Sequence, residues 1–137
     1  MTEQNGQPEQ AATTRKKILM IDDTATFLHV LNHILRDDYE TLVAKSGEDG
    51  LEVARMVRPD LILLDVMMPG MSGHDVLKIL KADNDLKEIP VILITGNSDE
   101  ENEGLGLSLG ATDYIKKPFA KNAVKSRIDA VIQGLKD

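Results

Sequence analysis

The sequence predicts an α/β protein: a doubly wound, five-stranded parallel sheet of (βα)5 order with helices on both faces. Three observations lead to this prediction. Short apolar runs without polar alternation recur along the chain, as in strands that are buried on both faces. Segments with helical apolar spacing alternate with these runs, and the connections between them are short. Right-handed crossovers then favour the doubly wound topology over other arrangements of parallel strands.

The length of the chain predicts a single domain. At 137 residues, it can form one well-packed core but not two. Residues 1–14 are rich in Gln, Glu, Thr and Ala and have no apolar period, so we expect a disordered N-terminal tail. The folded domain is expected over residues 15–137.

The first half of the domain predicts two strands and two helices. The apolar run at residues 18–21 predicts the first strand, and the weaker segment at residues 41–44 predicts the second. A helix after the second strand follows Ser46 and stops near Pro59. The helix between the two strands has an apolar stripe formed by Phe27, Val30, Leu31, Ile34 and Leu35.

The second half continues this alternation. Apolar runs at residues 61–64 and 91–94 predict the third and fourth strands, and residues 113–116 predict a fifth. A helix that follows Ser72 lies between the third and fourth strands. The last helix has an apolar stripe formed by Val124, Ile128, Val131, Ile132 and Leu135.

The fourth helix is expected to be only marginally stable. Ser98, with Glu101 three residues later, forms a capping box at its start. Gly104 and Gly106 then fall inside the helix, where each costs about 1 kcal/mol relative to alanine. With Gly110 they nearly match a dinucleotide-binding loop, but no strand precedes them, so that interpretation is not favoured.

Composition excludes several classes of function. The formal net charge is −7 and lysine and arginine are not clustered, which disfavours direct binding to nucleic acid or to a membrane surface. Without cysteine, the chain can form neither disulfides nor thiolate metal sites. No apolar run is long enough to span a bilayer and no signal peptide opens the chain, so we expect a cytoplasmic protein.

Chemically useful side chains follow the predicted strands. Asp22 and Asp23 follow the first strand, Asp65 the third, Thr95 the fourth and Lys117 the fifth. Ligands of open parallel sheets bind outside the carboxyl ends of the strands. Singly, each residue has a simpler explanation: the acids as a helix cap or turn, Thr95 as a loop hydroxyl, and Lys117 as a solvated side chain. Their joint position favours a shared site.

These residue types suit phosphoryl transfer. Converging carboxylates repel one another, and a divalent cation relieves that repulsion. Oxygen ligands without His or Cys favour a hard ion, here Mg²⁺. One carboxylate can then attack a phosphoryl group and form an acyl phosphate. A lysine and a hydroxyl supply the charge and hydrogen bond that the transferred oxygens need.

The whole motif set resembles one family. It consists of Asp22-Asp23, Asp65 with Met68-Pro69-Gly70 and Met71-Ser72-Gly73, Thr95-Gly96, Gly110-Ala111 and Lys117-Pro118-Phe119. Over about residues 16–136 the chain resembles the receiver domain of two-component response regulators. That resemblance implies a flavodoxin-like fold and a phosphoryl donor that is a sensor histidine kinase or a phosphotransfer protein. It also implies a regulator rather than an enzyme.

The resemblance assigns a role to each site residue. Asp65 would be the phosphoacceptor, and Mg²⁺ would bind Asp22, Asp23, Asp65 and the backbone carbonyl of Met67. Lys117 would pair with the phosphoryl oxygens, while Thr95 and Tyr114 would form the switch. An unknown downstream protein would bind the face formed by the fourth helix, fifth strand and fifth helix.

Two positions are expected to set a slow loss of the phosphoryl group. By family position, Met67 and Asn97 flank the path of an attacking water. Met67 is apolar and can exclude that water, and Asn97 cannot take a proton from it.

Two other functions use related folds. Phosphatases of the haloacid dehalogenase type also have an aspartate nucleophile, but they need a second aspartate two residues later, where this chain has Met67. Flavodoxin-type flavin carriers bind phosphate at the first loop, where Asp22 and Asp23 would repel it. A yellow colour, or turnover of phosphate monoesters, would distinguish these alternatives.

Overall fold

The computed structural model describes residues 15–96, 100–117 and 120–134. The expected tail, the capping-box residue Ser98, and Asn97 lie outside these ranges. Five parallel strands form one sheet, as predicted, and their order in the sheet is β2-β1-β3-β4-β5. The strands are β1 (Lys17–Ile21), β2 (Glu40–Ala44), β3 (Leu61–Asp65), β4 (Val91–Thr95) and β5 (Asp113–Lys116).

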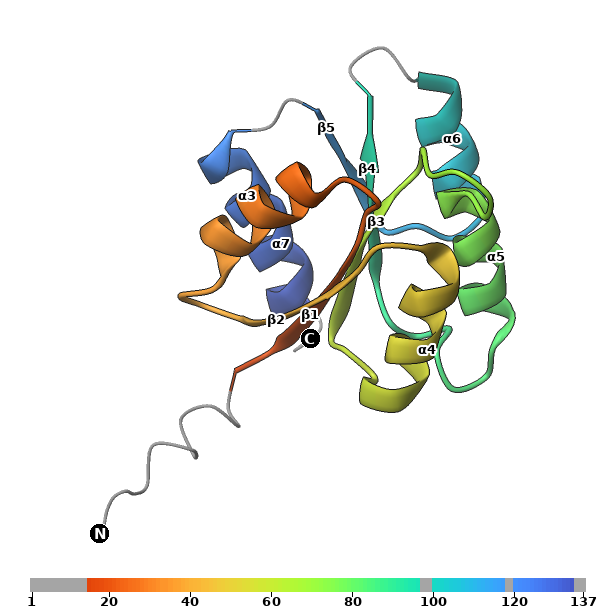
Figure 1. Cartoon of the computed structure of the whole chain (residues 1–137), viewed down its shortest axis with the longest axis horizontal. Coiled ribbons are helices and arrows are strands. Elements are labelled where there is room, and N and C mark those ends of the chain that lie inside the picture. Colours follow the sequence, from red (N-terminus) through yellow and green to blue (C-terminus); the bar gives the residue numbers. More distant parts are fainter. Residues whose placement is uncertain (1–14, 97–99, 118–119, 135–137) are drawn as a thin grey trace, which may run out of the picture.

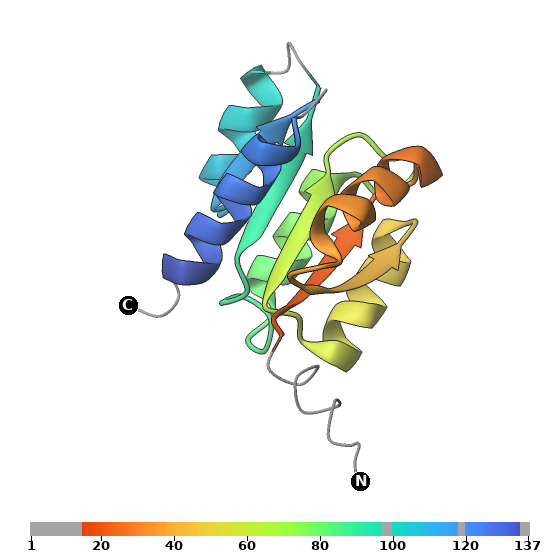
Figure 2. The same cartoon turned by 90° about the vertical axis from the view of Figure 1, so that its left-hand side faces the viewer.

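Helices cover both faces of the sheet. Figures 1 and 2 show α3 and α7 on one face and α4, α5 and α6 on the other. Each helix connects two successive strands except α7, which follows the last one. The helices are α3 (Ala25–Leu35), α4 (Gly47–Val57), α5 (Gly73–Ala82), α6 (Glu100–Ser108) and α7 (Lys121–Gly134). The doubly wound prediction is therefore confirmed.

The sheet separates two apolar cores, because successive strand residues point to opposite faces. On β1, Ile18 and Met20 pack with α3 and α7, while Leu19 and Ile21 pack with α4 and α5. Strands β3 and β4 are buried along their full length. Continuous apolar runs are thus explained by burial on both faces.

Local signals start two of the helices. The Ser46 side chain accepts a hydrogen bond from the Asp49 backbone N–H at the start of α4. At α5, Ser72 and Asp75 form a reciprocal capping box. Gly73 follows that cap, where a Cβ atom would lie only 2.3 Å from the carbonyl oxygen of Asp65. Glycine thus lets α5 begin directly against the end of β3.

Gly106 has a packing role that its sequence context does not indicate. A Cβ atom at this position would lie 2.0 Å from Leu93 Cδ1, so the glycine brings α6 close to β4. At Gly104 a Cβ atom would meet nothing within 4 Å. The two glycines of α6 therefore differ: one is required by packing and the other is not.

Candidate functional site

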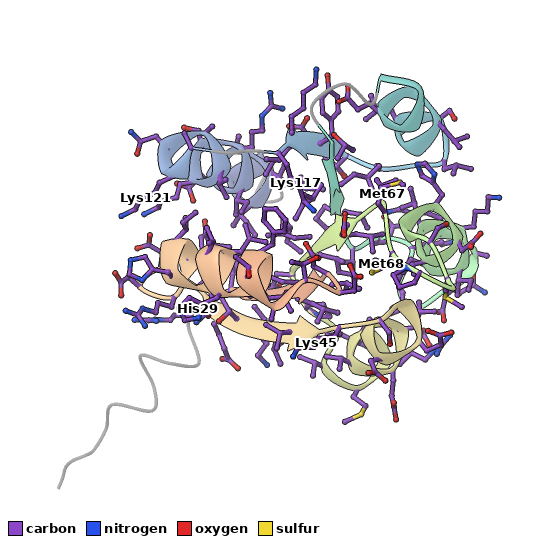
Figure 3. All side chains as sticks on the ribbon, turned by 45° about the horizontal axis from the view of Figure 1, so that its top comes forward. His29, Lys45, Met67, Met68, Lys117 and Lys121 are labelled. Atoms are coloured by element: carbon purple, nitrogen blue, oxygen red, sulfur yellow. The ribbon has the colours of Figure 1, made fainter. Side chains whose placement is uncertain are left out.

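The predicted site residues lie together at the carboxyl ends of four neighbouring strands. Asp65 and Thr95 end β3 and β4, Asp22 follows β1, and Lys117 follows β5. The strand order reverses between β1 and β3, which is where open α/β sheets bind ligands. Figure 3 shows Lys117 and Met67 at this end of the molecule.

Three carboxylates form the centre of the site. Each of Asp22, Asp23 and Asp65 offers an oxygen within 4.8 Å of the other two. Asp22 is buried and Asp65 is 2% exposed, whereas Asp23 is open to solvent. Asp22 Oδ1 accepts a hydrogen bond from the Thr24 backbone N–H at 2.9 Å. Thr24, rather than either acid, is the N-cap residue of α3, so the simple capping explanation is not supported.

Lys117 extends over this cluster. Its Nζ lies 3.6 Å from Asp65 Oδ1 and 3.9 Å from Asp22 Oδ2. The same ammonium group lies 3.9 Å from the centre of the Phe27 ring on α3. The Lys117 ammonium group thus lies close to two of the three carboxylates. A single positive charge cannot balance the whole acidic cluster.

The surroundings of Asp65 disfavour its charged form. Burial, and then the negative charge of Asp22, raise the pKa of Asp65 to about 6, while Lys117 and the Met67 backbone N–H partly oppose this. The Met67 N–H donates to Asp65 Oδ1 at 3.2 Å. Because only the ionised carboxylate is a nucleophile, more positive charge at the site would make Asp65 more reactive.

The donor set fits a hard divalent cation. All available ligand atoms are oxygens, which Mg²⁺ and Ca²⁺ prefer. Asp22 Oδ2 is buried and accepts no hydrogen bond from any residue in the described ranges. Such an atom is costly unless a cation is present, and Lys117 at 3.9 Å pairs with it only weakly. A metal beside Asp22 would satisfy this oxygen.

Thr95 is tied into the site by two bonds. Its carbonyl oxygen accepts from the Lys117 backbone N–H at 2.8 Å. Its hydroxyl donates to Glu103 Oε2 on α6 at 3.2 Å. Glu103 is 5% exposed, and its Oε2 lies 3.7 Å from Lys116 Nζ.

Sequence reasoning missed Glu103. A helical signal for it exists, because Glu103 precedes Gly106 by three residues and so shares its face of α6. Since Gly106 packs against Leu93 of β4, that face is the one directed at the sheet. An acidic residue on the face of α6 that packs against the sheet is unusual, and this pattern in the sequence could have drawn attention to Glu103.

The other predicted residues that the structure describes lie around this centre. Tyr114, on β5, is half-buried against the core under α4 and α5, and Arg127 lies 5.8 Å from its ring. The Met67 side chain is 66% exposed beside Asp65. Asn97 falls outside the described residues, as do Pro118 and Phe119.

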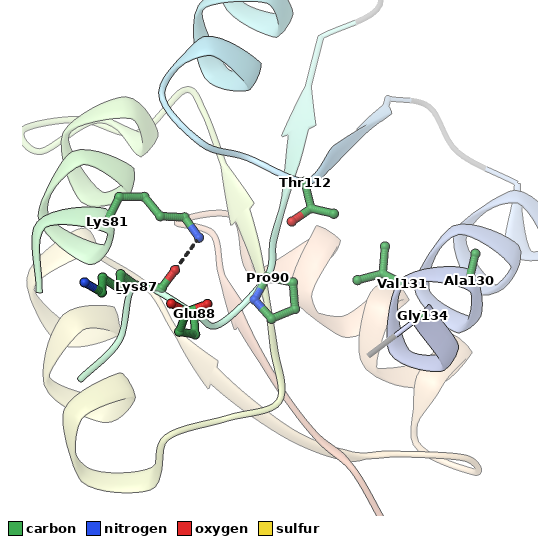
Figure 4. Close-up of a pocket in the computed structure, with 8 residues that line it drawn as sticks. All are labelled: Lys81, Lys87, Glu88, Pro90, Thr112, Ala130, Val131 and Gly134. Carbon is green, nitrogen blue, oxygen red and sulfur yellow. Dashed lines mark hydrogen bonds between the residues drawn. The ribbon is translucent and has the colours of Figure 1, made fainter. Parts of the chain in front are cut away.

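A hollow at the other end of the strands, beside the amino ends of β4 and β5, is separate from this site. It has a volume of about 530 Å³. It lies beside Pro90 and Thr112, which precede β4 and β5, and Figure 4 shows the Lys81 ammonium group donating to the Lys87 carbonyl there. Its lining offers one carboxylate, from Glu88, and no counterpart of the acidic cluster.

The chain matches known proteins over most of its length. Residues 18–129 match the family model described as the response regulator receiver domain. The DNA-binding response regulator MtrA of Mycobacterium tuberculosis is 40% identical over 119 residues, which make up 86% of this chain and 51% of that protein. The chain thus spans about half the length of the curated relatives it matches.

Solved structures agree with this match. The signal receiver domain of a signal transduction histidine kinase from Syntrophus aciditrophicus has a TM-score of 0.81 and 36% identity, covering 88% of this chain and 92% of that one. The chemotaxis protein CheY4 of Vibrio cholerae has a TM-score of 0.81 and 30% identity, covering 85% and 98%. The resemblance found from the sequence motifs is confirmed.

Proposed function

The chain belongs to the response regulator receiver domain family, and from that membership we propose that Asp65 is the residue that accepts the phosphoryl group. Members of this family are generally signalling rather than catalytic domains, although one relative that matches is a probable cyclic di-GMP phosphodiesterase, of which this chain covers 26%. A phosphoacceptor switch is the role that fits this chain. The observation that carries the assignment is the position of Asp65 between Lys117 and the other two acids.

In the transfer step, a carboxylate oxygen of Asp65 attacks phosphorus. The new P–O bond forms as the bond from phosphorus to the donor's leaving group breaks, and the leaving group keeps that electron pair. The product is an acyl phosphate. Asp65 is held for this attack by the Met67 N–H bond and by the close start of α5 at Gly73.

Mg²⁺ is the cofactor that the acidic cluster would hold. Asp22, Asp23, Asp65 and the backbone carbonyl of Met67 are the proposed ligands. When bound, the ion supplies positive charge that offsets the carboxylates and the oxygens of the incoming group. The orphaned Asp22 oxygen supports this assignment.

Lys117 and Thr95 would bind the transferred group. Lys117 already lies 3.6 Å from Asp65, and after transfer its ammonium group pairs with a phosphoryl oxygen. Thr95 is joined to Lys117 through the backbone bond of 2.8 Å. When the Thr95 hydroxyl turns towards the phosphoryl group, Tyr114 on the neighbouring strand turns inward. The surface of α6, β5 and α7 is then altered for a downstream protein.

The donor and the output are also proposals. The family's phosphoryl donors are histidine kinases, so a sensor histidine kinase or a phosphotransfer protein is proposed as the donor. The acidic composition favours a protein rather than nucleic acid as the direct partner of this domain. A cytoplasmic location is also proposed, from the family membership. In the described residues, no helix is both long and apolar enough to cross a bilayer.

A mass measurement tests the assignment of Asp65. The protein is incubated with a small phosphodonor such as acetyl phosphate, with and without Mg²⁺, and its intact mass is recorded. Wild type should gain one phosphoryl group only with Mg²⁺, and Asp65→Asn should gain none. Asp37→Asn, which alters an exposed acid after α3, is the matched control and should behave as wild type. An Asp65→Asn protein that is phosphorylated at the wild-type rate contradicts the proposal, and steady release of phosphate would favour a phosphatase.

A further inference from the structure

The Glu103 carboxylate lies inside the fold, next to the proposed switch residue. It is 5% exposed, and it accepts a hydrogen bond from the Thr95 hydroxyl at 3.2 Å. A buried carboxylate is costly unless it is paired, so this position needs compensation. Lys116 supplies part of it, with its Nζ 3.7 Å from Glu103 Oε2.

The packing of α6 directs Glu103 towards Thr95. Gly106 lies one turn after Glu103, and its missing side chain lets the helix approach Leu93 on β4. Glu103 shares this inward face of the helix. The position of α6 therefore places the Glu103 carboxylate at the end of β4, within hydrogen-bond distance of Thr95.

The Thr95 hydroxyl can donate a hydrogen bond to only one acceptor at a time. The Thr95 hydroxyl has one hydrogen to donate, and it is directed at Glu103. To donate to a phosphoryl oxygen on Asp65, the hydroxyl must leave Glu103. Hydrogen bonds to an ionised acceptor are about twice as strong as neutral ones, so the bond opposes closure of the switch.

Lys116 allows this bond to break. It is the register partner of Thr95 on β5, and it is a different residue from Lys117, which faces Asp65. After Thr95 leaves, Glu103 still has the Lys116 ammonium group beside it. The buried carboxylate is then not left without a positive charge.

We propose that Glu103 is a positioning residue of the switch, which holds the Thr95 hydroxyl away from Asp65 and so sets how much phosphoryl binding is needed to close it. This inference rests on the proposed roles of Asp65 and Thr95. Removal of the acceptor should favour the closed state, because Thr95 then has no competing partner.

The test uses beryllofluoride with Mg²⁺ as a stand-in for the phosphoryl group, with binding followed by fluorine NMR. Glu103→Met removes the acceptor and keeps a side chain of similar size. It should bind beryllofluoride about tenfold more tightly than wild type, the fold-change carried by one hydrogen bond to a charged group. Glu103→Gln keeps a neutral acceptor and should show a smaller gain. Glu52→Met, an exposed position on α4, is the control and should match wild type.

A second background separates positioning from a general structural effect. Thr95→Val removes the hydroxyl, so Glu103→Met should then change the beryllofluoride affinity by less than about twofold. The proposal is overturned if Glu103→Met binds like wild type, or if its effect is equally large with Thr95→Val. If Glu103→Met does not fold, the same comparisons with Glu103→Gln decide. Failure of wild type to bind beryllofluoride, with Asp65→Asn identical to it, would instead reject the function proposed for Asp65.

Discussion

The ammonium group of Lys117 lies over the Phe27 ring, 3.9 Å from its centre, while it also faces Asp65 at 3.6 Å. The lysine is thus held from two sides, by an aromatic face from α3 and by the carboxylates of Asp22, which follows β1, and Asp65, which ends β3. A cation over an aromatic ring contributes about 0.5–2 kcal/mol, depending on how far water is excluded.

Loss of the Phe27 ring should slow phosphorylation. Phe27→Leu keeps an apolar side chain but removes the ring face, so Lys117 is less well positioned over Asp65. We expect a fall in the phosphorylation rate of between about twofold and tenfold, from the size of the cation–ring interaction. Phe27→Tyr keeps the ring and is the control. The rate is measured from intact mass against time, and a Phe27→Leu protein as fast as wild type would show that the ring has no role.

Mg²⁺ should stabilise the fold, since a ligand that binds only the native state raises its stability. In EDTA, Asp23→Asn should melt at a higher temperature than wild type, because it removes one of three repelling charges. In millimolar Mg²⁺ this difference in melting temperature should become smaller or change sign, since the variant has lost a metal ligand. Thermal melts with and without the metal check this. An unchanged wild-type melting temperature on addition of Mg²⁺ argues against the metal site.

The buried Asp65 should make metal-free stability depend on pH. Its pKa is 3.8 when unperturbed and about 6 in the fold, so the native state holds the proton more tightly than the unfolded chain. This contribution is favourable below about pH 4 and is lost as pH rises through about 6, at a cost of about 3 kcal/mol. The Asp65→Asn side chain does not titrate, so the stability of this variant does not fall over this pH range for this reason. In EDTA, its advantage in unfolding free energy over wild type should grow from pH 4 to 7, and denaturant titrations that show a constant difference would contradict this.

The two glycines of α6 should respond in opposite ways to alanine. Gly104→Ala adds a methyl group in open space and should stabilise the fold by up to about 1 kcal/mol. Gly106→Ala places one against the fully buried Leu93 and should cost about 1–3 kcal/mol despite the better helix propensity. Each variant is the other's control in urea unfolding. Equal effects of the same sign would mean that α6 does not pack closely on β4.

The phosphoryl group on Asp65 should be lost slowly. Met67 has no polar group to orient a water, although its side chain is largely exposed. A Met67→Asn, Asn97→Glu protein supplies an amide and a carboxylate at the two positions and should dephosphorylate faster. Decay of the phosphorylated mass is followed after removal of the donor. Loss from wild type within seconds, or no acceleration in the double variant, would contradict this account.

The sequence predicted the strands because burial on both faces leaves a direct signal. The runs at 18–21, 61–64 and 91–94 are apolar without interruption, and they form β1, β3 and β4. Asp65 and Thr95 could be placed at one sheet edge because parallel strands end there together. The order of residues along the chain was therefore enough to predict the fold and the family.

Contacts between distant helices and strands could not be predicted in this way. That Phe27 faces Lys117 depends on how α3 is rotated over the sheet, and an apolar residue in an amphipathic helix indicates only burial. The contact between Glu103 and Thr95 depends on how closely α6 approaches β4, which Gly106 determines. The raised pKa of Asp65 depends on three-dimensional burial, which a strand-end position does not specify.

The strand order also makes the chain vulnerable to truncation. Strand β5 is at one edge of the sheet and pairs along its length with β4. Without residues from Asp113 onward, β4 would present an unpaired row of backbone donors and acceptors on a wholly buried, apolar segment. An exposed apolar strand of this kind is a template for intermolecular pairing. Chains that end before β5, including chains that are still being synthesised, are therefore expected to aggregate through residues 91–95. Their first defect would be this aggregation, and not the loss of Lys117 from the site.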